Sequence, residues 1–194
     1  MRLLTWDDSG SFKFTDYYPA GSTIPPYAIL SHRWGPDEVT YEDLKHGTGL
    51  QKSGYNKIRF CAERAKRDGL QHFWIDAYVS CAASSGTIQD SKPAWHASFY
   101  SSSWFTRGWT LQELLAPAQV DVFSKEGERL GSKESLEHLV CTITGIPASA
   151  LRGIPLPKFS FSERMAWAER RETTIPEDRA YSLLGIFSGR MQLL

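Results

Sequence analysis

The chain has 194 residues, 41% of them hydrophobic and 23% charged, so it is long enough to bury the core of one soluble domain. Its 22 basic residues equal its 22 acidic ones, so no net charge favours binding to nucleic acid or to an anionic membrane. No uncharged apolar run reaches the roughly 18 residues that a transmembrane helix needs. These properties predict a cytoplasmic protein without membrane or nucleic-acid partners.

The N-terminal segment, residues 1–26, is polar and rich in turn-forming residues, and we expect it to lie on the surface. The three cysteines, Cys61, Cys81 and Cys141, lie far apart in the sequence. Their number and spacing suit a reducing compartment and match neither a disulfide framework nor a zinc site. We therefore expect no bound metal.

Three consecutive segments have the pattern of a strand, a crossover helix and a second strand. "YAILSH" (27–32) and "QHFWID" (71–76) are short apolar runs, which predict buried strands. Between them, residues 54–70 place apolar side chains at helical spacing, with Gly69 as the expected stop. A strand, helix and strand in this order predict parallel pairing and an α/β fold.

Residues 77–103 are rich in Ser, Ala and Gly and have no convincing periodicity, so they resemble an irregular insertion. After them we predict a short helix over 109–115 that ends before Pro117, and a strand over 119–123.

The C-terminal part of the chain is predicted to be helical. "SKESLEHLVCTITG" is amphipathic, with Ser132 as the expected cap. Two more helices are predicted after Ser160 and Thr174, because Glu163 and Glu177 follow three residues later, which is capping-box spacing.

Long blocks of the sequence resemble the fungal heterokaryon incompatibility (HET) domain. The blocks are "YAILSHRWG" with "VTYEDL", "GYNKIRFCAERAKRDGLQHFWID" and "SSWFTRGWTLQELLAP", followed by "SLEHLVCTITGIP" and "FSFSERMAWAERRETTIPEDRAYSLLGIF". The resemblance implies an α/β core over 27–125 and a helical C-terminal part of the same domain over 126–194. It also implies a role in fungal non-self recognition, an innate immune response in which incompatible hyphae die after fusing.

HET domains are thought to be distantly related to TIR domains, so the resemblance further implies a flavodoxin-like parallel sheet with flanking helices. Here the sequence departs from the family, because the helix and strand expected after Asp76 are absent. In the strand order 2-1-3-4-5 that strand would lie in the middle of the sheet. Either the sheet closes differently, or the chain is a degenerate relative, or the gene model omits coding sequence.

Glu113 is the candidate catalytic residue. "SSWFTRGWTLQEL" is similar to the TIR helix that carries the catalytic glutamate of NAD-cleaving members, and Glu113 occupies the matching position. A carboxylate there would stabilise an oxocarbenium-like centre while the nicotinamide leaves. Alternatively, Thr110 and Glu113 have the spacing of a capping box, which would give the carboxylate a purely structural role.

The other candidate ligand-binding residues are expected near the carboxyl ends of the parallel strands, where open α/β sheets bind ligands, or in the tryptophan-rich block. They are Ser31, Arg33, Trp34, Asp76 and Arg107. A hydroxyl, a guanidinium and an indole in such places could bind ribose, phosphate and a base. Each side chain could equally serve in capping or packing.

Two hypotheses for the function follow. In the first, the chain is an enzyme that takes NAD as its substrate and has no permanently bound cofactor. In the second, it is an inactive interaction module that binds protein partners or itself, and the sequence departure after Asp76 favours this alternative.

Overall fold

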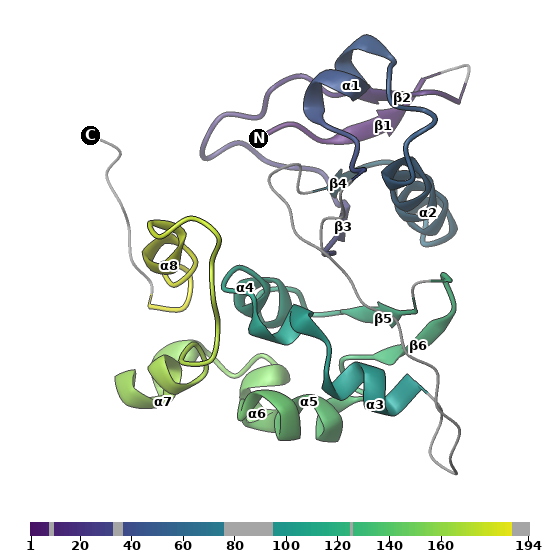
Figure 1. The fold of residues 1–194 in the computed structure, drawn as a ribbon. Coiled ribbons are helices and arrows are strands. Elements are labelled where there is room, and N and C mark those ends of the chain that lie inside the picture. The colour runs from purple at the N-terminus through teal and green to yellow at the C-terminus, as the bar shows by residue number, and fades with distance from the viewer. Residues whose placement is uncertain (8–9, 33–36, 76–94, 125, 188–194) are drawn as a thin grey trace. The chain divides into compact units, whose positions relative to one another are not determined.

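The computed structural model describes residues 1–7, 10–32, 37–75, 95–124 and 126–187. The chain divides into two compact units, residues 1–84 and 85–194 (Figure 1). The first unit therefore combines the N-terminal segment with the first part of the expected α/β core. No helix in the described ranges combines the length and the apolar character that crossing a membrane requires.

A small sheet and two helices make up the described part of the first unit. In chain order they are β1 (Leu4–Trp6), β2 (Phe12–Phe14), β3 (Ala28–Leu30), α1 (Tyr41–His46), α2 (Gly54–Arg67) and β4 (Phe73–Ile75). The strand order is β2-β1-β4-β3, with β3 and β4 parallel, as the sequence predicts. The predicted strand–helix–strand unit is thus confirmed as β3, α2 and β4.

The sheet is mixed rather than wholly parallel, because β1 pairs antiparallel with both β2 and β4. A short turn joins β1 to β2, and short turns permit only antiparallel neighbours. At this turn the Asp7 amide donates to the Ser11 carbonyl oxygen at 2.9 Å, and Gly10 has a φ of 82°. The expectation that the whole of 1–26 lies on the surface is wrong for the hairpin, since Leu3 and Leu4 are 0% and 4% exposed.

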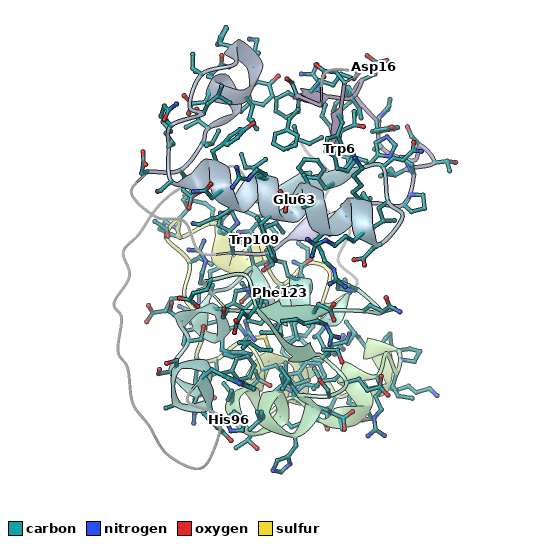
Figure 2. All side chains as sticks on the ribbon, turned by 90° about the vertical axis from the view of Figure 1, so that its right-hand side faces the viewer. Trp6, Asp16, Glu63, His96, Trp109 and Phe123 are labelled. Carbon is teal, nitrogen blue, oxygen red and sulfur yellow. The ribbon has the colours of Figure 1, made fainter. Side chains whose placement is uncertain are left out.

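Helix α2 packs its apolar face onto the sheet. The buried side chains of that face are Ile58, Cys61, Ala62 and Ala65, and they cluster with Leu4, Val39 and Phe73. On the opposite face Glu63 is exposed (Figure 2). Gly69, with φ of 74°, ends the helix as predicted, since the Gly69 and Leu70 amides donate back to the carbonyls of Lys66 and Ala65.

The described part of the second unit is mostly helical. Its elements are α3 (Trp95–Tyr100), η1 (Ser103–Thr106), α4 (Thr110–Leu115), β5 (Asp121–Phe123), β6 (Arg129–Ser132), α5 (Glu137–Thr144), α6 (Ala148–Leu151), η2 (Leu156–Lys158), α7 (Phe161–Ala166) and α8 (Asp178–Tyr181). The core beneath them includes Leu111, Leu114, Val140, Ile146, Trp167 and Ile186.

Several predictions for this unit are confirmed and others are wrong. The helix over 109–115 and the strand over 119–123 are present as α4 and β5. The strand pairs with β6 in a separate antiparallel hairpin, rather than with a parallel sheet. The stretch 95–100, expected to be irregular, is helix α3. We also expected a helix and a strand to be missing after Asp76. That expectation falls on residues 76–94, which lie outside the described residues.

The helix caps also give a mixed result. Ser160 and Glu163 form the predicted capping box at the start of α7. Thr174 and Glu177 do not form one, because Glu177 is itself the N-cap of α8 and makes no side-chain capping bond. Ser132 ends β6, and α5 begins five residues later, at Glu137.

Candidate functional site

Glu113 lies in α4 and is partly buried. The capping box proposed for it is not formed through Thr110, because Thr110 is the first residue of α4 and Trp109 is the N-cap. The Thr110 hydroxyl is directed instead to the carbonyl oxygens of Trp104 and Arg107, at 2.6 and 2.8 Å. Glu113 is therefore not held by the local contact that its sequence spacing suggests.

Glu113 interacts electrostatically with Arg171, a residue far along the chain. Arg171 is only 6% exposed. Burial lowers the pKa of its guanidinium to about 10, and the negative charge of Glu113 works in the opposite direction. The guanidinium thus stays charged at neutral pH, with Glu113 as its acidic counterpart.

Hydrogen bonds hold the Arg171 guanidinium in a fixed place. Its Nη1 donates to the Arg107 carbonyl oxygen at 2.9 Å and to the Thr110 hydroxyl at 2.8 Å. Its Nε donates to the Trp167 carbonyl oxygen at 3.1 Å. The side chain therefore ties the turn before α4 to the segment that follows α7.

Arg107 contributes to this network through its backbone. Besides accepting from Arg171, it forms a parallel bridge with Glu172. Next to it, the Gly108 amide donates to the Glu172 carbonyl oxygen at 2.8 Å, and the Glu172 amide donates to the Thr106 carbonyl oxygen at 2.7 Å. The Arg107 backbone thus bonds to Arg171 and Glu113 acts on Arg171 electrostatically, while binding of phosphate by the Arg107 side chain stays a prediction.

The remaining candidates belong to the first unit. Ser31 directly follows β3 and is partly buried. Arg33, Trp34 and Asp76 lie outside the described residues. The described end of this loop nevertheless leads into a cluster of polar side chains that the sequence did not reveal.

That cluster consists of His32, Glu38 and Lys57. The His32 Nε2 lies 3.6 Å from a carboxylate oxygen of Glu38, and the two side chains are 11% and 8% exposed. Glu38 also forms an ion pair with Lys57 of α2. Desolvation, followed by the positive charge of Lys57, lowers the pKa of His32 despite the nearby carboxylate and so favours the neutral imidazole.

The space beside this cluster is small. The cavity lined by His32, Glu38 and Lys57 measures about 10 Å³, which is scarcely enough for one water molecule. Gly54 packs directly against Glu38, since a Cβ there would lie 2.6 Å from the Glu38 carboxylate. The cluster therefore has a structural role: its polar side chains pack closely together and connect the loop after β3 to α2. In the described parts of the chain, no group of three or more His, Cys, Asp or Glu residues is placed to hold a metal ion.

The sequence pointed to candidate residues such as Glu113 and Arg107, but not to the side chains that interact with them. Glu38 follows His32 by six positions, and a carboxylate so close to a histidine was a usable signal. Arg171 gave none, because it lies in the charged run "ERRETT" and its contacts are all distant in sequence.

The fold defines the protein as a small mixed α/β chain with a helical second unit. Neither a protein-family model nor a solved structure matches it. Its whole length is 46% identical to part of vegetative incompatibility protein HET-E-1 from Podospora anserina. The chain is therefore related to the HET proteins.

The match covers the chain fully and the relative only in part. The chain spans 17% of the length of HET-E-1. The comparison runs over 226 positions, at least 32 more than the chain has residues. HET-E-1 accordingly carries residues within the matched stretch that this chain lacks.

Proposed function

We propose that this chain is a fungal HET domain that acts in the cytoplasm, in non-self recognition and the cell death that follows it. The supporting observation is the 46% identity to a vegetative incompatibility protein over the full length of the chain. Because the chain corresponds to 17% of that protein, we extend to it only the role of a signalling domain.

The experiment that tests this role is regulated expression of the chain in a filamentous fungus, with cell viability as the readout. The matched control is Leu111→Asp, which places a charge at a position that is 0% exposed and should unfold the second unit. We expect death with the native chain and survival with the control. A native chain that accumulates in folded form and leaves viability unchanged would contradict the proposal.

As a finer proposal, the domain has a TIR-like relationship and cleaves NAD. Water would add to the ribose carbon as nicotinamide leaves, with the Glu113 carboxylate stabilising the positive charge that develops. Support comes from the similarity of "SSWFTRGWTLQEL" to the TIR helix. Ser31, Arg33, Trp34, Asp76 and Arg107 are the residues proposed to bind the substrate.

The alternative is a non-catalytic module that signals by self-association or by binding a protein partner. The observation that favours it is the electrostatic interaction of Glu113 with the buried Arg171, because a carboxylate that helps to balance a buried charge has a structural role. Measurements on the purified native protein and on its Glu113→Gln variant distinguish the catalytic hypothesis from the non-catalytic one. Loss of NAD consumption with unchanged thermal stability supports catalysis. Absence of turnover in the native protein, together with concentration-dependent association, supports the module.

The extra residues of HET-E-1 bear on this choice. We propose that they lie after Asp76, because the family resemblance implies a helix and a strand there that the sequence lacks. A surplus of at least 32 positions is about the size of these two elements. Grafting the corresponding segment of HET-E-1 at this place, and measuring NAD consumption again, would test whether the shorter chain has lost an activity.

A further inference from the structure

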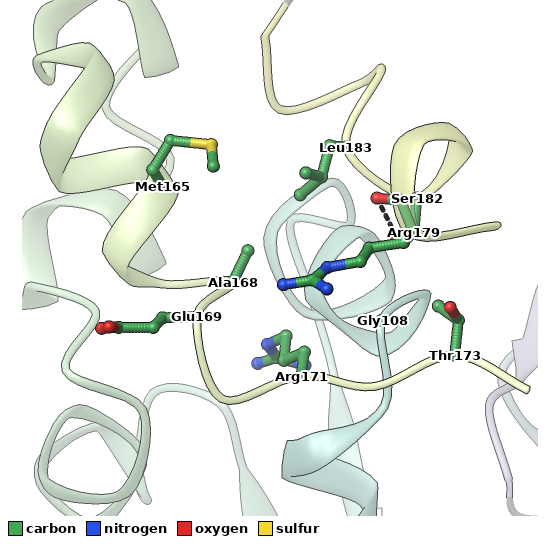
Figure 3. A pocket seen from close by; sticks show the side chains of 9 residues that line it. All are labelled: Gly108, Met165, Ala168, Glu169, Arg171, Thr173, Arg179, Ser182 and Leu183. Carbon is green, nitrogen blue, oxygen red and sulfur yellow. Dashed lines mark hydrogen bonds between the residues drawn. The ribbon is translucent and has the colours of Figure 1, made fainter. Parts of the chain in front are cut away.

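A hollow of about 50 Å³ lies in the second unit, beside the network of Arg171. Its wall is built by the end of α7 and the segment after it, by α8 and the residues that follow it, and by the turn before α4 (Figure 3). The lining residues are Gly108, Met165, Ala168, Glu169, Arg171, Thr173, Arg179, Ser182 and Leu183. The space is large enough for a small polyatomic ion or a few water molecules.

Arg171 lines the hollow, and part of its guanidinium has unused hydrogen-bond donors. A guanidinium carries five N–H groups, and those of Nε and Nη1 are directed to Trp167, Arg107 and Thr110. Nη2 is buried and has no hydrogen-bond partner among the described residues. A buried charged donor without a partner is costly, so a ligand that accepts its hydrogen bonds would bind favourably.

A second guanidinium reaches the same hollow. Figure 3 shows the side chain of Arg179 extending beside that of Arg171, although the two come from different segments. Arg179 is exposed, and in the described part of the structure its guanidinium makes no ion pair. Two positive charges are therefore directed at one small space.

The acidic groups nearby compensate this charge only in part. Glu169 lines the hollow, but its carboxylate is turned away from both guanidinium groups (Figure 3). Glu113 acts on Arg171 electrostatically but does not line the hollow. The space therefore has an excess of positive charge and of hydrogen-bond donors.

We propose that the hollow between Arg171 and Arg179 binds the phosphate group of a small molecule. Guanidinium groups match the oxygens of a phosphate in paired hydrogen bonds. The Ser182 hydroxyl, which makes only a 3.5 Å bond to the Arg179 carbonyl oxygen, is placed to add another donor. Phosphate has more acceptor oxygens than a carboxylate, which suits donors that converge from two arginines and a serine. This inference does not depend on the proposed signalling role.

Isothermal titration of the full chain, with inorganic phosphate and with a nucleoside monophosphate at constant ionic strength, tests the site. Arg179→Gln is the main variant, because Arg179 is exposed and its loss should leave the fold intact. Arg170→Gln is the matched control, since it removes the same charge at an exposed neighbouring position outside the hollow. We expect saturable binding that Arg179→Gln weakens by about tenfold or more and that Arg170→Gln leaves unchanged.

Three results would overturn the proposal: no saturable binding of either probe, equal weakening in both variants, or acetate binding as tightly as phosphate. Arg171→Lys provides a second check where the variant remains folded. It retains the charge but loses the unpartnered Nη2, so phosphate affinity should fall even though the net charge is the same.

Discussion

The Nη1 atom of Arg171 lies 2.8 Å from the hydroxyl of Thr110, a residue 61 positions earlier in the chain. Both side chains are buried, at 6% and 2% exposure. This contact joins the start of α4 to the segment after α7. It also engages the Thr110 hydroxyl, which is therefore not available to cap α4. The stability of the second unit should depend on it.

Thr110→Val removes this hydroxyl without changing the shape of the side chain. It leaves Nη1 of Arg171 with one acceptor fewer in a buried place, so we expect a loss of about 1–3 kcal/mol in the free energy of unfolding. Urea denaturation provides the measurement. Thr106→Val is the control, because Thr106 is exposed and its hydroxyl bonds only to the nearby Ser103 carbonyl. Equal stability of the two variants would contradict the role assigned to Thr110.

Gly108→Ala should destabilise the second unit by crowding. A Cβ at Gly108 would lie 2.5 Å from Cγ2 of Thr173 and 3.0 Å from Oγ of Ser182. Overpacking of this kind typically costs about 1–3 kcal/mol. Because the closest atom is a methyl group, the double variant with Thr173→Ser should recover part of the loss in thermal denaturation. No recovery would mean that the crowding arises elsewhere.

Cys61 should be inert to alkylation in the folded protein. It is 4% exposed, and burial raises the pKa of its thiol to about 12, so almost no thiolate exists at pH 8. Cys141 is more exposed, although its pKa is also raised, chiefly by burial. Iodoacetamide followed by peptide mass spectrometry should therefore label Cys141 before Cys61. In guanidinium chloride the two labelling rates should become similar, and early labelling of Cys61 without denaturant would contradict the prediction.

The first unit should lose stability in acid partly through Asp43. Hydrogen bonds from Lys52 and then from Thr40 hold the pKa of this carboxyl well below its usual range. A carboxyl with a depressed pKa stabilises the fold above its unfolded pKa, near 4, and this contribution is lost as the pH falls further. Asp43→Asn should therefore flatten the decline of the urea midpoint between about pH 5 and pH 2.

The control for this prediction is Glu42→Gln, since Glu42 is a neighbouring, more exposed carboxylate with a 3.6 Å ion pair to Lys45. Its pH profile should follow that of the native chain. A profile of Asp43→Asn that also follows the native one would show that the bond to Lys52 is unimportant for folding.

Sequence patterns predicted helix α2 from its periodic apolar positions and the two strands beside it from short apolar runs. Helix α2 and the strands on either side of it are present because their apolar positions bury against one another. The β1–β2 hairpin was missed, because its strands lie in a polar, turn-rich segment. Thr174 and Glu177 have capping-box spacing, yet the helix starts after Glu177, so local spacing alone misplaced its beginning.

For the candidate site, sequence supplied Glu113 and Arg107 but not what joins them. Arg171 reaches the Arg107 carbonyl across 64 residues, and a contact over such a distance leaves no local pattern. The cluster of His32 and Glu38 lies within one loop and was closer to detection. Which polar side chains are satisfied internally is decided by tertiary packing, and a single sequence does not record it.

The arginine bridge also has a consequence for synthesis of the chain. Thr110 and the carbonyl of Arg107 leave the ribosome long before Arg171 has been translated, and until then their polar groups remain hydrated. Completion of the second unit therefore awaits late-emerging residues, and a nascent chain halted before residue 171 would lack the side chain that fastens α4.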